Sequence, residues 1–321
     1  MKEVLDVKDR KILYALDCNS RQSISQLAKK VALSKEVVHY RIKRLEKEKY
    51  INGYYTLIDF SKLGYFSVRM YLKYFDTNAD IESEITDYLT KHKKVFYAIE
   101  FEGNIDAAFA VLVKSIYEFE DFYFAFKKKF KQYIKKDNFS IFTLAHHFHR
   151  AYLLNKKIDD IRPEVFGKSE IEKYDLIDIK ILRMMAKNAR MPIVELSQKL
   201  KIPARTVAFR IKQLEKKKII QGYRFIFNFQ KYGYQYYKVD LILKDISRLK
   251  SLVEYCHTNP NILYIDQMIG GTDFEFDLEV KNKEQFLDII NDLRDKFPEI
   301  REWSYFSATK AYAKLEYFPE E

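Results

Sequence analysis

Residues 6–54 read DVKDRKILYALDCNSRQSISQLAKKVALSKEVVHYRIKRLEKEKYINGY, and residues 175–223 read DLIDIKILRMMAKNARMPIVELSQKLKIPARTVAFRIKQLEKKKIIQGY. The second stretch repeats the first at an offset of 169 residues. Residues of the first copy that are identical in the second include Asp6, Asp9, Lys11, Asn19, Arg21, Leu27, Val38, Arg41, Leu45, Glu46, Ile51, Gly53 and Tyr54. The chain is therefore a tandem duplication, and the architecture of one repeat predicts that of the other.

Capping residues and apolar spacing divide the first copy into three short helices. Asp6 can cap the first helix, and Ser23-Ile-Ser-Gln26 has the capping-box pattern that opens the second. Ser34 can cap a third helix, whose inner positions are Val38, Ile42 and Leu45. A helix, a tight turn and a second amphipathic helix predict a helix-turn-helix whose last helix enters the DNA major groove. Residues 50–59 then predict a hairpin wing, because Asn52-Gly53 is a turn signal.

The same residues carry a family resemblance. They are Leu5-Asp6, Asp9-x-Lys-Ile-Leu13, Asn19-Ser-Arg21, Leu27-Ala28, Leu33-Ser34, Val38-x-x-Arg-Ile-Lys-x-Leu-Glu46, Ile51-x-Gly-Tyr54 and Leu63-Gly64. This run resembles the winged helix-turn-helix of the Lrp/AsnC family, the leucine-responsive or feast/famine transcriptional regulators. The resemblance occurs twice in the chain and implies a sequence-specific, DNA-binding transcriptional regulator that is not an enzyme.

Net charge is divided unevenly along the chain. Residues 1–64 carry a net charge of +6 and residues 175–233 carry +10, so the rest of the chain is at −5. An excess of Lys and Arg confined to the helix-turn-helix units is expected of modules that neutralise phosphates. We therefore expect double-stranded DNA as the partner. The competing interpretation, that these lysines form a solvated face, does not explain why the other segments are acidic.

Composition favours a cytoplasmic globular protein that associates with the nucleoid. The 321 residues are 47% hydrophobic and 32% charged, which is ordinary for folded domains. Because no long apolar span or signal-like N-terminus occurs, we expect no membrane partner. Cys18 and Cys256 occupy non-equivalent places in the repeats and lack a metal-binding spacing, so we expect no metal and no cofactor.

After each basic unit the apolar pattern changes to a period of two with intervening helices. The expected elements of the first repeat are a strand at 66–75, a helix at 79–91, strands at 95–102 and 106–114, a helix from 116 and a strand at 139–153. Those of the second are a strand at 236–244, a helix through 255, strands at 262–269 and 274–280, a helix, and a strand from 301. The predicted fold class is α+β, a tandem repeat of a winged helix-turn-helix followed by a ferredoxin-like βαββαβ antiparallel sheet domain.

The domain boundaries follow from these patterns. We expect helix-turn-helix units at 1–64 and 175–233, βαββαβ domains at 65–154 and 234–321, and a polar linker at 155–174. A split βαβ sheet with both helices on one face leaves its other face to be covered. In the family that this chain resembles, that domain, called RAM, senses ligands and packs its sheet face to face on a partner's sheet. The partner here can be the other repeat, which predicts an intramolecular pseudo-dimer with further homo-oligomers left open.

The third helix of each unit supplies the expected DNA contacts, because its apolar stripe must face the core. In the first unit the candidates are Lys35, Glu36, His39, Tyr40, Lys43, Arg44 and Lys47. In the second they are Arg205, Thr206, Phe209, Lys212 and Lys216. Lys and Arg can pair with guanine or phosphate, and Phe209 can contact a thymine methyl or dock on protein instead. Pro192 and Pro203 replace the two capping serines in the second unit.

Four arginines recur in both units at other positions. Arg21 and Arg190 lie in loops, while Arg41 and Arg210 flank the third helices. We interpret them as holding each three-helix unit together rather than contacting bases.

Two loops match the Gly-x-x-Asp effector pattern of the family that this chain resembles. They contain Gly103 and Asp106 in the first repeat, and Gly270 and Asp273 in the second. The resemblance implies a small-molecule effector, such as an amino acid, near these turns. The alternative is that Gly and Asp simply form a good hairpin turn.

Two further functional classes compete with the regulator. A nucleoid or chromatin architectural protein would have the same charge distribution. Siroheme decarboxylases are similar in architecture, and the local candidate for such chemistry is Ala145-His-His-Phe-His-Arg150. Strand alternation separates His146 from His147 and His149, which disfavours a shared metal.

Overall fold

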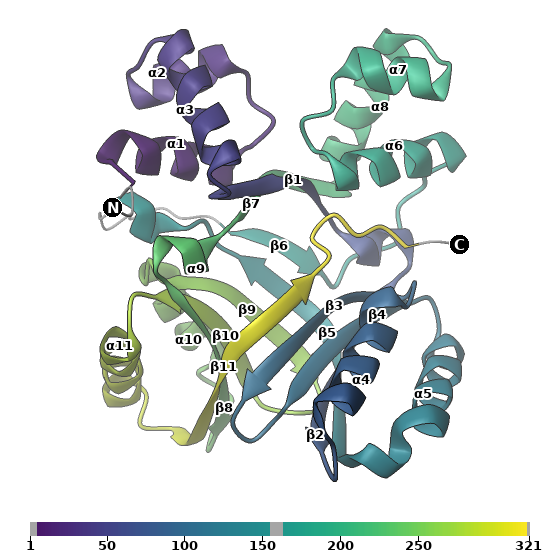
Figure 1. Ribbon diagram of the computed structural model, residues 1–321, viewed down its shortest axis with the longest axis vertical. Coiled ribbons are helices and arrows are strands. Elements are labelled where there is room, and N and C mark those ends of the chain that lie inside the picture. Colours follow the sequence, from purple (N-terminus) through teal and green to yellow (C-terminus); the bar gives the residue numbers. More distant parts are fainter. Residues whose placement is uncertain (1–4, 155–162, 320–321) are drawn as a thin grey trace.

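The computed structural model describes residues 5–154 and 163–319, with the backbone only at 310–313. Each repeat begins with three helices (Figure 1). They are α1 (Val7–Cys18), α2 (Ile24–Val31) and α3 (Lys35–Lys47) in the first unit, and α6 (Leu176–Lys187), α7 (Ile193–Leu200) and α8 (Ala204–Lys216) in the second.

The predicted caps of the first unit are confirmed. Asp6 accepts from Asp9 N at 2.7 Å, Ser23 and Gln26 form a reciprocal capping box, and Ser34 accepts from Val37 N at 3.3 Å. In the second unit, Pro192 and Pro203 precede α7 and α8, and neither helix has a side-chain cap hydrogen bond within the described structure.

The predicted hairpin wing is wrong. Residues Ile51–Ile58 form one strand, β1, which pairs antiparallel with its counterpart β7 (Ile220–Phe227) from the other repeat. A hairpin turning at Asn52-Gly53 would leave only a short first strand, whereas β7 offers a partner of full length. Asn52 and Gly53 instead fall within a register irregularity between Ile51 and Tyr54. The two helix-turn-helix units are thus joined by a shared two-stranded sheet.

Each βαββαβ domain forms in the predicted order, but the last strand of the first repeat, predicted at 139–153, instead begins at Ile134 and ends at His147, before a helical turn. The first consists of β2 (Phe66–Tyr74), α4 (Ala79–Lys91), β3 (Val95–Glu102), β4 (Ala107–Val113), α5 (Ile116–Phe130) and β5 (Ile134–His147). The second consists of β8 (Gln235–Leu243), α10 (Leu249–Thr258), β9 (Ile262–Ile269), β10 (Phe274–Val280), α11 (Lys283–Lys296) and β11 (Ile300–Ala313). Short helical turns are η1 (Phe60–Leu63), η2 (Lys131–Tyr133), η3 (Ala151–Leu154) and α9 (Phe229–Tyr232).

The two four-stranded sheets join at both edges into a closed ring, which we call the barrel. The last strand of each repeat is 14 residues long and pairs twice, first within its own sheet and then with the other repeat. β5 pairs with β2 and then with β9, and β11 pairs with β8 and then with β3. The expected face-to-face arrangement is therefore supplemented by hydrogen-bonded edges. The helices lie on the outside of the barrel (Figure 1).

The expected linker is only partly described. Residues 155–162 lie outside the described residues, and β6 (Glu164–Gly167) within the expected linker adds to β5 as a further strand. In the described ranges, no helix is long and apolar enough to cross a membrane.

The hydrophobic cores of the helix-turn-helix units draw on both repeats. Phe225 and Phe227 of β7 are buried in the core of the first unit. Ile58 of β1 and Leu63, which belong to the first unit, are buried in the core of the second. Each unit therefore depends on the other half of the chain for part of its apolar burial.

Candidate nucleic-acid interface

Helix α3 buries one face and exposes the other. Val38, Ile42 and Leu45 are buried, as predicted. The expected DNA contacts that are exposed to solvent are Lys35, Glu36, His39, Tyr40, Lys43 and Lys47. Five of these, from Lys35 to Lys43, line a groove of about 580 Å³ together with Ile24 of α2. The pKa of Glu36 is lowered by hydrogen bonds from its own backbone N–H and the Ser34 hydroxyl, so that its carboxylate is available as an acceptor.

Arg44 departs from the prediction because it faces the unit rather than the groove. Its guanidinium donates to Asp9, and it lies 3.8 Å from Glu48. Asp9 is buried, and a buried carboxylate requires a cation or several donors. Arg41 serves the same carboxylate at 2.8 Å and reaches Asp6 at 2.7 Å. Arg41 therefore holds the unit together as predicted, through the first-helix cap.

The second unit presents a different set of side chains. Arg205, Phe209, Lys212 and Lys216 are exposed on α8, whereas Thr206 is half-buried. Phe209 is 60% exposed, so its ring is free to contact a thymine methyl or another protein surface.

Of the two recurring arginines in the second unit, Arg210 makes the same kind of contacts as its counterpart in the first unit. Arg210 binds Asp175 at 2.7 Å and Asp178 at 3.0 Å, as Arg41 does at its own helix cap. Arg21 and Arg190 do not follow the prediction, because each stacks over a tyrosine of the opposite unit. Arg21 lies over Tyr223.

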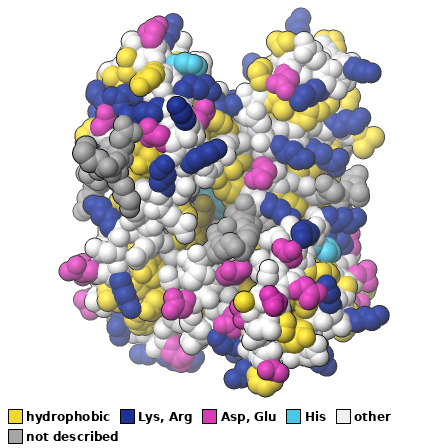
Figure 2. All heavy atoms as spheres, viewed as in Figure 1, with side chains coloured by type: hydrophobic (Ala, Val, Ile, Leu, Met, Phe, Trp, Pro, Cys, Tyr) yellow, Lys and Arg dark blue, Asp and Glu magenta, His cyan; other side chains and the backbone are white. Residues whose placement is uncertain are grey.

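Positive charge covers both units. Figure 2 shows Lys and Arg side chains gathered over the two helix-turn-helix units, while Asp and Glu are more frequent over the barrel below. This agrees with the charge division along the sequence and provides a surface suited to a polyanion.

The two Gly-x-x-Asp loops are stabilised by their aspartates. Asp106 accepts from Tyr74 N at 2.6 Å and from Lys73 at 2.7 Å. Asp273 accepts from the equivalent Leu243 N at 2.8 Å. These bonds fit the hairpin-turn interpretation, and the effector role stays a prediction.

The histidines of β5 and the following turn occupy separate environments. His147 is half-buried between Phe166 and Tyr264, and desolvation and then Arg224 lower its pKa to about 3. His146 contacts His257, whereas His149 lies 3.8 Å from Glu164. Among the described residues, no group of three metal-ligating side chains is close enough to hold an ion.

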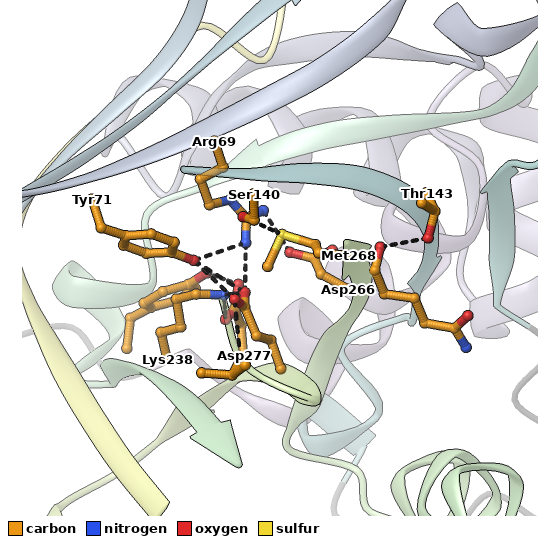
Figure 3. Close-up of polar contacts among 12 residues, drawn as sticks. Arg69, Tyr71, Ser140, Thr143, Lys238, Asp266, Met268 and Asp277 are labelled. Atoms are coloured by element: carbon orange, nitrogen blue, oxygen red, sulfur yellow. Dashed lines mark hydrogen bonds and ion pairs between the residues drawn. The ribbon is translucent and has the colours of Figure 1, made fainter. Parts of the chain in front are cut away.

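A polar cluster inside the barrel was missed by sequence reasoning. We call it the barrel cluster, and its members are Arg69, Tyr71, Lys238, Asp240, Asp266, Glu275 and Asp277. In Figure 3, Tyr71, Lys238 and Asp277 converge below Arg69. Arg69 binds Asp266 at 2.6 Å and Glu275 at 2.7 Å, which links the repeats. The sequence signal for this cluster is that charged residues occupy alternate positions of these strands. Such a pattern normally indicates a strand face exposed to solvent, and it indicates a buried cluster only when the sheets close into a barrel.

Comparisons with known proteins agree with this geometry. The family model described as "Winged helix-turn-helix DNA-binding" matches residues 5–52 and 174–221. An HTH-type transcriptional regulator of Pyrococcus abyssi is 30% identical over 107 residues, which cover 33% of this chain and 71% of that protein. The Bkd operon transcriptional regulator of Pseudomonas aeruginosa is 32% identical over 126 residues, which cover 37% and 78%.

These matches define the chain as a DNA-binding transcriptional regulator of the winged helix-turn-helix class, in which β1 and β7 pair with each other where a hairpin wing was predicted. It belongs to the Lrp/AsnC family and carries two tandem copies of the family's unit. A solved structure of the siroheme decarboxylase NirDL matches 97% of this chain and 94% of its own with a TM-score of 0.65. Its identity of 12% shows a shared fold and no more.

Proposed function

We propose that this regulator binds a specific DNA site with both units, the two halves of the chain acting as an intramolecular pseudo-dimer. The observation that carries the proposal is the antiparallel pairing of β1 with β7, which joins the two units on one side of the barrel (Figure 1). A homodimeric helix-turn-helix protein reads two half-sites with two copies of one helix. Here α3 and α8 take those places within a single chain.

The proposed contacts are the exposed side chains of the two helices. In α3 these are Lys35, Glu36, His39, Tyr40, Lys43 and Lys47, and in α8 they are Arg205, Phe209, Lys212 and Lys216, to which the half-buried Thr206 is added. Lys43, which is exposed, also pairs with the half-buried Glu46 at 2.8 Å, and a phosphate can take the place of Glu46 as its partner.

Salt dependence of binding tests the proposal. Replacing Lys43 and Lys47 by Gln is expected to weaken binding to every DNA sequence and to lower the salt slope by about two. The pair Lys212→Gln and Lys216→Gln tests the second unit in the same way. A matched control is Lys250→Gln, which removes an exposed lysine from α10 on the barrel. Fluorescence anisotropy from low to high salt measures both affinity and slope, and binding that ignores salt would contradict the proposal.

The ratio of specific to non-specific affinity separates a regulator from an architectural protein. Binding-site selection from random DNA is expected to yield one motif that is bound at least about 1,000-fold more tightly than random sequence. Equal affinity for all sequences would favour the nucleoid role. A haem-like absorption band in the purified protein would favour the decarboxylase-like alternative.

We also propose an amino-acid effector near the turns at Gly103, Asp106, Gly270 and Asp273. The support is the match of both loops to the family's pattern. Thermal unfolding with each amino acid tests it, and a stabilising ligand should lose its effect in Asn104→Ala and Thr272→Ala, which alter the turns but keep the aspartate hydrogen bonds.

A further inference from the structure

The two helix-turn-helix units hold each other through a pair of reciprocal contacts. The guanidinium of Arg21 lies 5.7 Å from the ring centre of Tyr223, and that of Arg190 lies 5.0 Å from Tyr54. Both arginines sit in the loop after the first helix of their own unit, and both tyrosines sit on the strand of the opposite unit. A planar guanidinium stacked on a ring that is mostly buried is a directional contact.

Each tyrosine is in turn fixed to a DNA-reading helix. The Tyr223 hydroxyl donates to Glu215 of α8 at 2.6 Å, and the Tyr54 hydroxyl donates to Glu46 of α3 at 2.7 Å. A chain of contacts therefore runs from the loop of one unit, through a tyrosine, to the reading helix of the other. We call the two chains of contacts the clamps, Arg21–Tyr223–Glu215 and Arg190–Tyr54–Glu46.

Backbone hydrogen bonds lie beside each clamp and repeat the same symmetry. The N–H of Ser20 donates to Tyr223 O at 2.8 Å, and the N–H of Ala189 donates to Tyr54 O at 3.1 Å. Together with the β1–β7 pairing, these bonds fix the position of each loop along the opposite strand. The arginines add a side-chain contact that resists rotation of one unit relative to the other.

The two clamps are unequal. Nη1 of Arg21 donates to the carbonyls of Ala189 and Met191, so Arg21 also bridges directly to the opposite loop. Nη1 of Arg190 is buried and has no hydrogen-bond partner among the described residues. The Arg21 clamp is thus the more completely bonded of the two.

We propose that Arg21 and Arg190 are positioning residues that fix the separation and rotation of α3 relative to α8, and thereby set the spacing between the two DNA half-sites. The proposal rests on the proposed function. Inserting two base pairs rotates one half-site by about 70° around the duplex, since a helical turn takes about 10 base pairs. A rigid pair of units cannot follow that rotation, whereas a loosened pair can.

Binding to spacer variants of the selected site tests the clamps. The wild-type protein is expected to lose at least about tenfold in affinity when the spacer changes by two base pairs. Arg21→Ala should flatten this dependence to below about threefold, and Arg190→Ala should flatten it less. Lys29→Ala is the matched control, because it removes an exposed positive charge from α2 of the same unit and should leave the spacing preference unchanged. A spacing preference that survives in Arg21→Ala overturns the proposal.

A measurement without DNA separates failure of the clamps from failure of the proposed function. Nitroxide labels at Lys47→Cys and Lys216→Cys, with the half-buried Cys18 changed to Ser, report the distance between α3 and α8 by pulsed electron resonance. Arg21→Ala should at least double the width of that distance distribution, and an unchanged width overturns the proposal. If Arg21→Ala fails to fold, Arg21→Lys keeps the charge, removes the planar stack and is expected to broaden both profiles.

Discussion

Arg69 of β2 and Lys238 of β8 occupy the same position in the two repeats, and both bind the Glu275 carboxylate inside the barrel. The repeats do not match at the acidic positions, since Glu275 and Asp277 of β10 correspond to Ala108 and Ala110 of β4. The first repeat thus supplies a cation to carboxylates that only the second repeat carries. This asymmetry makes the barrel interior a polar junction between the halves.

Removing Arg69 is expected to destabilise the protein strongly. Arg69→Met leaves Asp266 and Glu275 without their shared guanidinium in a buried site, which costs about 3–5 kcal/mol. Urea unfolding gives the value. The control Lys91→Met breaks an exposed pair with Asp87 and should cost less than about 0.5 kcal/mol. Equal effects of the two substitutions would contradict this account of the cluster.

Asp240 should contribute less to stability as the pH rises. Burial, and next the neighbouring Glu275, raise the pKa of Asp240 from 3.8 to about 7, against the opposing effect of Lys238. Between about pH 4 and about pH 7 the folded state holds a proton on Asp240 that the unfolded chain has released, so the contribution of Asp240 to the free energy of unfolding decreases as the pH rises through this window. Asp240→Asn should therefore gain up to about 4 kcal/mol relative to wild type between about pH 4 and about pH 8. Urea unfolding at both pH values measures it, and a difference independent of pH would refute the prediction.

Asp17 is expected to anchor the first unit to the barrel. It is fully buried on α1, where it accepts from Arg150 N at 2.7 Å and lies 3.5 Å from Arg224. Burial would raise the pKa of Asp17, but Arg224 and Arg150 lower it overall. Asp17→Asn should speed hydrogen exchange in α1 and leave α6 unchanged, because the second repeat has Ala186 in this place. Equal acceleration in both helices would argue against a local anchor.

The repeats are expected to need each other to fold. Deleting residues 170–321 removes Phe225 and Phe227 from the core of the first unit and β9 from the edge of β5. The remaining fragment exposes apolar surface and unpaired strands, so it should dimerise or aggregate. Sedimentation velocity checks this, and a well-folded monomeric fragment would contradict the mutual dependence of the halves.

The DNA site should be asymmetric. The α3 helix presents Glu36, which can accept from a cytosine amino group, whereas α8 presents Arg205 in the same place, which pairs with guanine. The selected motif should contain two unlike halves in fixed order. Exchanging residues 35–43 for 204–212 should make it more symmetric. A perfect palindrome would instead mean that two chains pair their equivalent units.

Local signals in the sequence determined the helices, their caps and the order of strands. Asp6, Ser23 and Ser34 cap helices because a side-chain oxygen meets a backbone N–H within four residues, which a short stretch of chain contains in full. The duplication and the excess of positive charge in the two helix-turn-helix units could likewise be identified from the sequence, since neither requires knowledge of distant contacts. The α+β tandem architecture followed from these patterns.

Tertiary structure decided where the strand edges and the charged side chains go. β1 pairs with a strand 169 residues away instead of folding back on itself, and Arg69 faces inward only because the two sheets close at both edges. Arg44 lies near Asp9 because the first and third helices cross there, and Arg21 reaches Tyr223 because the units are joined. Each of these partners is far away in the chain. A polar or charged residue can pair with many partners, so the sequence alone does not determine which distant one it contacts.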